Sequence, residues 1–159
     1  MALRKILTVD TAEAELRRVA RPVTSFDRRL AQLIDDMFDT MHATDDGAGL
    51  AATQVGVLKR VAVIDLGEEG KLELVNPEIL EASGEAEFEE GCLSIPGKRG
   101  RTKRPAYVKV RAFNRKGEEY IVEGEEIMAL ALVHEIGHLD GHLFTDYVVG
   151  DLWDLEQPR

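Results

Sequence analysis

The segment LALVHEIGHLDG, residues 130–141, contains the pattern H-E-x-x-H within a run of apolar residues. Side chains four residues apart lie on one face of an α-helix, so His134 and His138 can bind the same ion, and Glu135 can reach a water on it. One alternative is a core helix whose histidines are satisfied by hydrogen bonds. Because unpaired polar groups are costly in an apolar helix, we interpret the pattern as a metal site. Negative charge suits a helix N-terminus, so the helix should begin among Glu123, Glu125 and Glu126.

The composition of the chain limits the classes of function. Its 159 residues can bury a proper core, and we expect residues 1–159 to form one domain. Hydrophobic and charged contents of 44% and 31% are ordinary for a globular protein. The formal net charge of −10 argues against direct binding of nucleic acid. No stretch approaches the ~20 apolar residues of a membrane span, so we expect a cytoplasmic protein that does not contact a membrane, although a mature organellar protein would show the same pattern.

Two kinds of hydrophobic pattern precede the H-E-x-x-H segment. Apolar residues repeat at helical spacing as far as His42, and Ser25 or Asp27 is expected to cap that helix. We expect His42 to interact with the end of its helix rather than to bind a metal. From residue 60 the pattern favours strands, and Asn76-Pro77 is expected to end one of them. The strand-like segments are residues 60–66, 71–75, 79–88, 107–114 and 118–122. Strands followed by a helix predict an α+β fold with mainly antiparallel pairing.

A glycine-rich segment, residues 45–56, separates these two regions. Gly47, Gly49 and Gly56 let the backbone approach another group closely. The segment lacks the Lys-Ser/Thr pair of a phosphate-binding P-loop, and it is only a degenerate dinucleotide-binding pattern. Taken alone, it predicts a structural turn.

Cys92 is the one cysteine of the chain, so no internal disulfide can form, and this fits a reducing compartment. A lone cysteine is usually a small buried hydrophobe. Here, however, it lies in a segment bounded by glycine and proline, residues 89–97, and the two-histidine site lacks a third ligand. Catalytic sites of the zinc type take three protein ligands and a water. Cys92 is therefore a candidate third ligand.

Three segments together point to a known family: residues 47–54 (GAGLAATQ), 90–94 (EGCLS) and 134–139 (HEIGHL). In this order the chain closely resembles peptide deformylase, from about residue 4 to residue 147. The resemblance implies an α+β fold in which antiparallel β-sheets pack around a central metal-bearing α-helix. It also implies a hydrolase that removes the formyl group from N-formylmethionine at the start of new polypeptides.

The resemblance implies the roles of several residues. The metal ligands would be Cys92, His134 and His138, and the family typically uses Fe²⁺, while Zn²⁺, Ni²⁺ or Co²⁺ can occupy the site. Glu135 would be the catalytic carboxylate. The formyl oxygen would be bound by Gln54 and by the backbone amide of Leu93.

Substrate-binding positions are expected around this centre. Gly49, Gly91 and Arg99 are expected to contact the substrate, Arg99 because it matches such a position in the family. Leu130 lies one helical turn before His134 and should form a wall of the methionine pocket. The rest of the basic run, residues 98–104, is expected to be a solvated turn. The expected partners are N-formylmethionyl peptides emerging from the ribosome, and the protein is expected to be a monomer.

Three positions depart from the usual family pattern. Ala48 stands where a bulky aliphatic residue is common, Val133 where glutamine is common, and Gly137 where aspartate is common. Gly137 removes a polar residue that could support the metal ligands, and glycine inside a helix costs ~1 kcal/mol relative to alanine.

Two rival readings remain open on the residues alone. A metzincin-type protease continues the pattern to a third histidine at position 144, where this chain has Phe144, and His142 comes two residues early. A non-catalytic module that binds a metal or a formyl-peptide is the other, and the presence of Glu135 argues against it.

Overall fold

The computed structural model describes residues 2–45 and 47–154. Within them, the chain forms three α-helices, eight strands and three 3-10 turns. The helices are α1 (Val9–Leu16), α2 (Arg28–His42) and α3 (Glu126–Leu139). The strands are β1 (Gly49–Ala51), β2 (Val61–Asp65), β3 (Lys71–Ser83), β4 (Ala86–Cys92), β5 (Ile95–Arg104), β6 (Tyr107–Phe113), β7 (Glu119–Glu125) and β8 (Trp153–Asp154). The 3-10 turns are η1 (Ala52–Val55), η2 (Gly67–Glu69) and η3 (Phe144–Tyr147).

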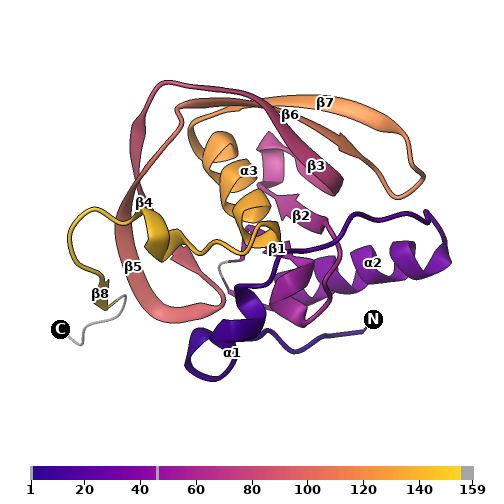
Figure 1. Cartoon of the computed structure of the whole chain (residues 1–159), viewed down its shortest axis with the longest axis horizontal. Helices are drawn as coiled ribbons and strands as arrows, with labels where there is room; N and C mark the ends of the chain where they lie inside the picture. The colour runs from indigo at the N-terminus through magenta and orange to yellow at the C-terminus, as the bar shows by residue number, and fades with distance from the viewer. Residues whose placement is uncertain (1, 46, 155–159) are drawn as a thin grey trace.

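The strands form two antiparallel sheets around α3. The larger sheet has the order β1-β2-β3-β6-β7, and the smaller one has the order β4-β5-β8. Figure 1 shows the larger sheet curving over α3, with the β4–β5 hairpin to one side of the helix. The predicted α+β fold, with antiparallel sheets around a central helix, is confirmed.

The first four residues of β2 are apolar because helices cover both of its faces. Ala62 and Ile64 belong to the core around α3, whereas Val61 and Val63 belong to the core around α2. Successive side chains of a strand point to opposite faces of the sheet, so a strand between two helices must be hydrophobic on both. This arrangement places α3 deep in the molecule.

The helix predicted before residue 42 is α2. The side chain of Asp27 accepts a hydrogen bond from the Leu30 amide at 3.0 Å, which identifies Asp27 rather than Ser25 as the cap. The apolar stripe of α2 faces the core, as predicted. His42 lies in the last turn of α2 as expected, but its ring bonds to Asp65 at 2.7 Å instead of capping its own helix.

Helix α3 ends in a defined backbone motif. Gly141 has φ +84°, a conformation that glycine adopts without a steric penalty. The Gly141 amide donates to the His138 carbonyl, and the His142 amide donates to the Gly137 carbonyl, the pair of bonds that forms a Schellman cap. At the other end only Glu126 lies in the first turn, because Glu123 and Glu125 belong to β7.

Two strand boundaries differ from the prediction. Asn76-Pro77 does not end β3, which continues to Ser83 with a shift of register between Val75 and Glu78. The basic residues 98–104, expected in a solvated turn, lie in β5, which pairs with β4. The glycine-rich segment also forms structure, since β1 and η1 lie within it.

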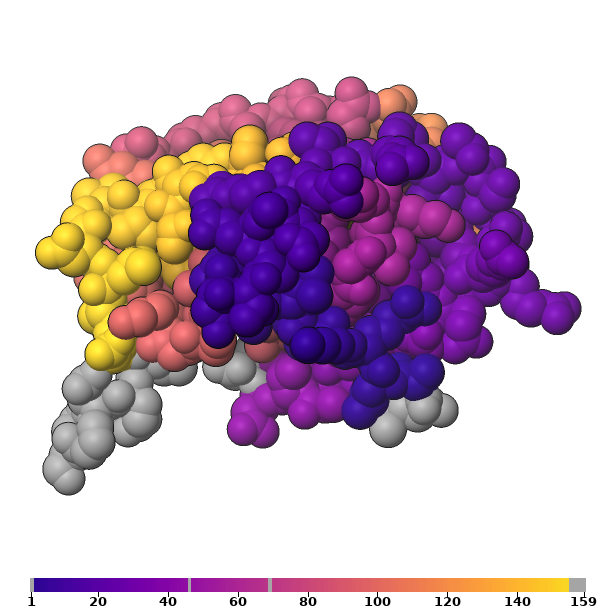
Figure 2. Space-filling view, turned by 60° about the horizontal axis from the view of Figure 1, so that its bottom comes forward, coloured from indigo at the N-terminus to yellow at the C-terminus, as the bar shows by residue number. Residues whose placement is uncertain are grey.

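The two ends of the described chain lie on one face. Figure 2 shows the N-terminal segment between the C-terminal segment and α2. Leu16 packs with Leu143 and Phe144, and Arg17 pairs with Asp146 at 2.6 Å. The backbone of Trp153 pairs with Arg99, which attaches the tail to β5 although the indole is 39% exposed. Over the ranges given above, none of the helices combines the length and hydrophobicity needed to cross a membrane.

Candidate metal centre and substrate cavity

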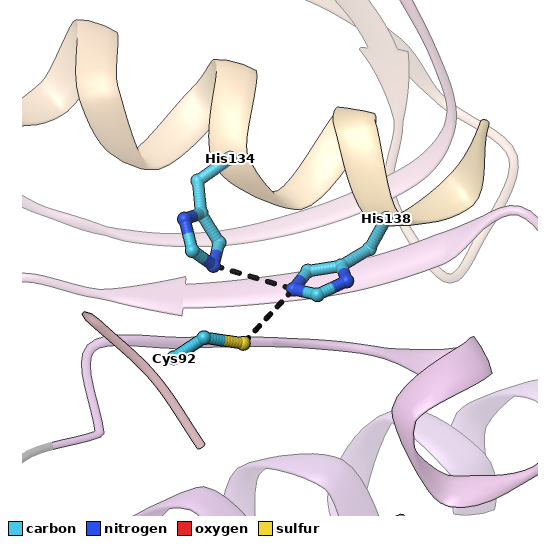
Figure 3. Close-up of side chains that lie close together, drawn as sticks. All are labelled: Cys92, His134 and His138. Atoms are coloured by element: carbon cyan, nitrogen blue, oxygen red, sulfur yellow. Dashed lines mark hydrogen bonds between the residues drawn. The ribbon is translucent and has the colours of Figure 1, made fainter. Parts of the chain in front are cut away.

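Three side chains from two elements converge at the centre of the molecule. His134 and His138 come from successive turns of α3, and Cys92 comes from the end of β4 (Figure 3). One ligand atom from each lies within 4.8 Å of the others. His138 Nε2 lies 3.2 Å from His134 Nε2 and 3.3 Å from Cys92 Sγ. Two imidazoles and one thiol in this arrangement suit a divalent metal ion that keeps a position open for water.

The buried ion pair of Glu90 and Arg104 orients the ring of His134. Its Nδ1 lies 2.7 Å from Glu90 Oε1, so the lone pair of Nε2 is left facing Cys92 and His138. Arg104 donates to both oxygens of Glu90, from Nε at 2.7 Å and from Nη2 at 3.0 Å. Thr102 Oγ1 donates to the same carboxylate. Glu90 and Arg104 are almost wholly buried.

Burial and these partners shift the pKa values of the site. Burial alone would raise the pKa of Glu90, but hydrogen bonds from His134 and Arg104 outweigh it and lower the value to about 2. Burial would lower the pKa of His134, but its bonds to Cys92 and Glu90 raise it. For His138, burial and the charges of His134 and Arg104 together lower the pKa well below the ordinary value. A neutral imidazole at His138 is the form that binds a metal.

Glu135 is placed for proton transfer. Its side chain is buried, and burial raises its pKa to about 7. Of the residues that the structure describes, none offers a hydrogen-bond partner to Oε1. The carboxylate lies beside β1, where a Cβ at Gly49 would be 2.5 Å from Oε2. Glycine at this position therefore leaves the space that the carboxylate occupies. A carboxyl group with a pKa near neutral can both take and return a proton.

Gln54 brings an amide to the same centre. It comes from η1, and its Oε1 accepts a hydrogen bond from the Ala51 amide at 2.9 Å. Its Nε2 lies 3.0 Å from Ser94 Oγ and 3.5 Å from Cys92 Sγ. Fixing the oxygen in this way points the donor nitrogen at the metal ligands, where it can bind a developing negative charge.

A cavity of about 400 Å³ opens beside these groups. Its lining includes the apolar residues Leu66, Leu130 and Ala131. It also includes the catalytic candidates, Gln54, Cys92, His134 and Glu135. Leu130 lines the cavity, and its assignment to a methionine pocket stays a prediction. The predicted substrate-binding residues Gly49, Gly91, Arg99 and Leu130, together with Gln54 and Leu93, are all lining residues.

The position of Arg99 in the lining of the cavity requires glycine at residue 91. A Cβ at Gly91 would overlap the guanidinium of Arg99, so the arginine lies across the glycine. Arg99 Nε also lies 4.0 Å from Glu89 Oε2 on the neighbouring strand. The arrangement holds a cation at the side of the cavity.

The third histidine of a metzincin-type site has no counterpart here. Phe144 occupies that position in sequence, is buried and stacks on the His134 ring at 6.4 Å between centroids. His142 is exposed, and its Nδ1 bonds to the Tyr147 hydroxyl at 3.0 Å. Neither residue supplies a ligand atom to the Cys92, His134 and His138 group.

Sequence reasoning did not single out the roles of Glu90, Arg104 and Ser94. Glu90 is one of many acidic residues, and Arg104 was part of the basic run expected in a turn. No clear signal was present in the local sequence, because residues 101, 103 and 104 are all basic, and only the folded β4–β5 pair shows that residues 102 and 104 are buried. A buried arginine on such a strand requires a buried acidic partner.

The chain is similar to known proteins over nearly its whole length. A family model described as polypeptide deformylase matches residues 3–151. A peptide deformylase of Acetivibrio thermocellus is 59% identical over 144 residues, which cover 91% of this chain and 84% of that protein. A crystal structure of a peptide deformylase from Legionella pneumophila matches with a TM-score of 0.87 at 45% identity, covering 93% of this chain and 87% of that one. One from Thermotoga maritima gives a TM-score of 0.89 at 38% identity, covering 94% and 100%.

Proposed function

The chain belongs to the polypeptide deformylase family, and on that premise we propose that Cys92, His134 and His138 bind one Fe²⁺ ion. It is an enzyme that removes the N-terminal formyl group from new polypeptides. The observation that carries the proposed site is the convergence of the three ligand atoms within 4.8 Å, beside a buried carboxylate. Imidazole and thiolate donors also suit Zn²⁺, Ni²⁺ and Co²⁺, which can take the same position.

The residues around the metal position have separate roles in the hydrolysis. A divalent cation held by Cys92, His134 and His138 would act as a Lewis acid and would make water available as hydroxide near neutral pH. Glu135 accepts the proton of the attacking water at Oε1, the oxygen for which no partner lies among the described residues. A new carbon–oxygen bond forms at the formyl carbon. Glu135 then gives the proton to the amine nitrogen as the carbon–nitrogen bond breaks, which releases formate and a free N-terminus.

The charge that develops on the formyl oxygen needs donors. Gln54 Nε2 and the Leu93 amide supply them, since both residues line the cavity next to Cys92. Donors fixed in advance cost no reorganisation during the reaction, and losing one in other enzymes costs about 3–4 kcal/mol. The bond from the Ala51 amide to Gln54 Oε1 fixes the orientation of this donor.

We propose that the substrate binds in the cavity. The unbranched apolar side chain of formyl-methionine suits the wall formed by Leu130 and its neighbours. Gly49 leaves room for the Glu135 carboxylate and Gly91 leaves room for the Arg99 guanidinium, and the peptide would bind beside these four lining residues. We further propose that residues 1–159 act as one catalytic domain and as a monomer. Its substrates are N-formylmethionyl chains emerging from ribosomes, which places the reaction in the cytoplasm.

Turnover of a formylated peptide tests the proposal. Protein loaded with Fe²⁺ without oxygen should release formate from a formyl-Met-Ala-Ser peptide and leave an unformylated copy unchanged. His134→Ala should abolish both metal binding and turnover, whereas His42→Ala is the matched control because its ring bonds to Asp65, outside the site. A His134→Ala protein that retains one metal ion per chain would overturn the proposed ligand set.

A further inference from the structure

A turn with two aromatic residues contacts the proposed metal ligand His134 and does not line the cavity. Turn η3 follows α3 and carries Phe144 and Tyr147. Phe144 is 1% exposed and stacks on the His134 ring, with 20° between the ring planes. Tyr147 lies over the guanidinium of Arg104, whose central carbon is 4.0 Å from the ring centroid. The two rings of one turn therefore contact the ligand and the ion pair that supports it.

The turn is fixed at both ends. Asp146 accepts a hydrogen bond from the Leu143 amide at 3.1 Å and pairs with Arg17 at 2.6 Å. Beyond the turn, the Val149 amide donates to the Arg101 carbonyl at 2.7 Å, which ties the chain to β5. Tyr147 is thus held against β5, the strand that carries Arg104.

Tyr147 covers the guanidinium of Arg104, which is paired with Glu90. The side chain of Arg104 is 5% exposed and that of Glu90 is 1% exposed, whereas Tyr147 is 37% exposed. A buried ion pair keeps its geometry when water is excluded and its hydrogen bonds are satisfied. A cation over an aromatic face is also attracted to the ring. Removing the ring would remove that attraction and admit water to Arg104.

We propose that Tyr147 is a positioning residue for the metal ligand His134, acting through Arg104 and Glu90. The carboxylate of Glu90 sets the orientation of the His134 ring through Nδ1, Arg104 sets the orientation of Glu90, and Tyr147 holds Arg104 in place. Groups that orient a ligating histidine typically change metal affinity by about 10–100-fold when removed. The inference rests on the proposed metal site and extends it to a residue that touches neither metal nor substrate.

The test is the rate at which cobalt leaves the protein. Co²⁺-loaded protein is mixed with excess EDTA, and the loss of the thiolate-to-cobalt absorbance is followed. Glu90→Gln should speed release by about 10–100-fold, and Tyr147→Ala, one step further out, by about 3–10-fold. Tyr147→Phe keeps the ring over Arg104 and should release cobalt within about twofold of the parent rate. Tyr147→Leu, which keeps apolar cover without an aromatic face, should release it faster than Tyr147→Phe does.

A double variant separates positioning from general loosening of the fold. If Tyr147 acts through Glu90, adding Tyr147→Ala to Glu90→Gln should change the release rate by less than about twofold. The matched control is Phe26→Ala, because Phe26 is also 37% exposed but packs on Phe113, away from the metal site. Its release rate should equal that of the parent.

Each remaining outcome counts against the inference. Parent-like release from Tyr147→Ala, or an effect that multiplies with that of Glu90→Gln, would show that Tyr147 does not act through the pair. Release from Phe26→Ala as fast as from Tyr147→Ala would show a general effect of aromatic truncation. A parent protein that retains no cobalt would overturn the proposed metal site itself, and this inference with it.

Discussion

Replacing Leu130 with tryptophan tests where the methionine side chain is bound. Leu130 lies one helical turn before His134, is 8% exposed and lines the cavity of about 400 Å³. An indole at this position should extend into the cavity and fill the space beside the metal ligands. A formyl-Met peptide needs that space, whereas a formyl-Ala peptide does not. The substitution should therefore change the preference between the two substrates rather than the chemistry.

The size of the effect follows from the groups that the cavity buries. A methionine side chain has three more heavy atoms than an alanine side chain. Burying each methylene-sized group contributes ~0.8 kcal/mol, so the difference is ~2.4 kcal/mol. That free energy corresponds to a ratio of roughly 60 between the kcat/KM values for formyl-Met and formyl-Ala peptides. In Leu130→Trp the ratio should fall at least about tenfold, while the kcat/KM for formyl-Ala changes little.

The assay measures both kcat/KM values in parent and variant, each with its metal content. Met128→Trp is the matched control, since Met128 is a partly buried residue of the same helix that does not line the cavity. Its substrate ratio should equal the parent ratio. An unchanged ratio in a folded, metal-loaded Leu130→Trp protein would refute this position of the methionine pocket and leave the deformylase activity standing.

Three further changes test the metal, the proton and the buried carboxylate. Cys92→Ala should lose the metal, measured as ions per chain, and undiminished metal would remove Cys92 from the site. Glu135→Gln should keep its metal while kcat falls by roughly 10²–10⁴-fold, and near-normal turnover would mean that another group takes the proton. Glu90 has a folded pKa of about 2, below its ordinary value of 4.5, so its contribution to stability is present above about pH 4.5 and is lost as the pH falls toward 2. Urea unfolding of metal-free protein between pH 5 and 2 should show a loss about 3 kcal/mol smaller in Glu90→Gln than in the parent, and equal losses would contradict the lowered pKa.

Periodicity predicted those elements whose side chains divide cleanly between core and solvent. The stripe before His42 became α2, and the alternation before Asn114 became β6, because in both the buried residues recur at the period of the element. The approach of His134 to His138 was predictable for the same reason, since four residues are about one turn of α3. Local spacing is enough where one element carries the whole pattern.

Features that depend on two distant segments were not predictable in this way. Asn76 continues β3 instead of ending it, because its side chain accepts from the Val23 amide at 2.7 Å and donates to the Val23 carbonyl at 3.0 Å. Asparagine also tolerates the positive φ of 50° at this position. No pattern within residues 71–83 indicates that Asn76 has a hydrogen-bond partner 53 residues earlier in the chain. The pairing of Glu90 with Arg104 was hidden similarly, because each charge taken singly is typical of a surface.

At Gly137 the sequence pattern and the contacts in the structure lead to different conclusions about how the His134 ring is supported. The glycine stands where the family commonly has aspartate, which suggests a loss of polar support for the metal ligands. In the structure, however, a Cβ at Gly137 would meet the His142 Cβ at 3.8 Å, toward the residue that bonds to Tyr147. The polar support of His134 comes instead from Glu90, which reaches Nδ1 from β4. The orientation of the His134 ring therefore depends on the strand pair β4–β5, through Glu90 and Arg104, more than on the residue inside the H-E-x-x-H pattern.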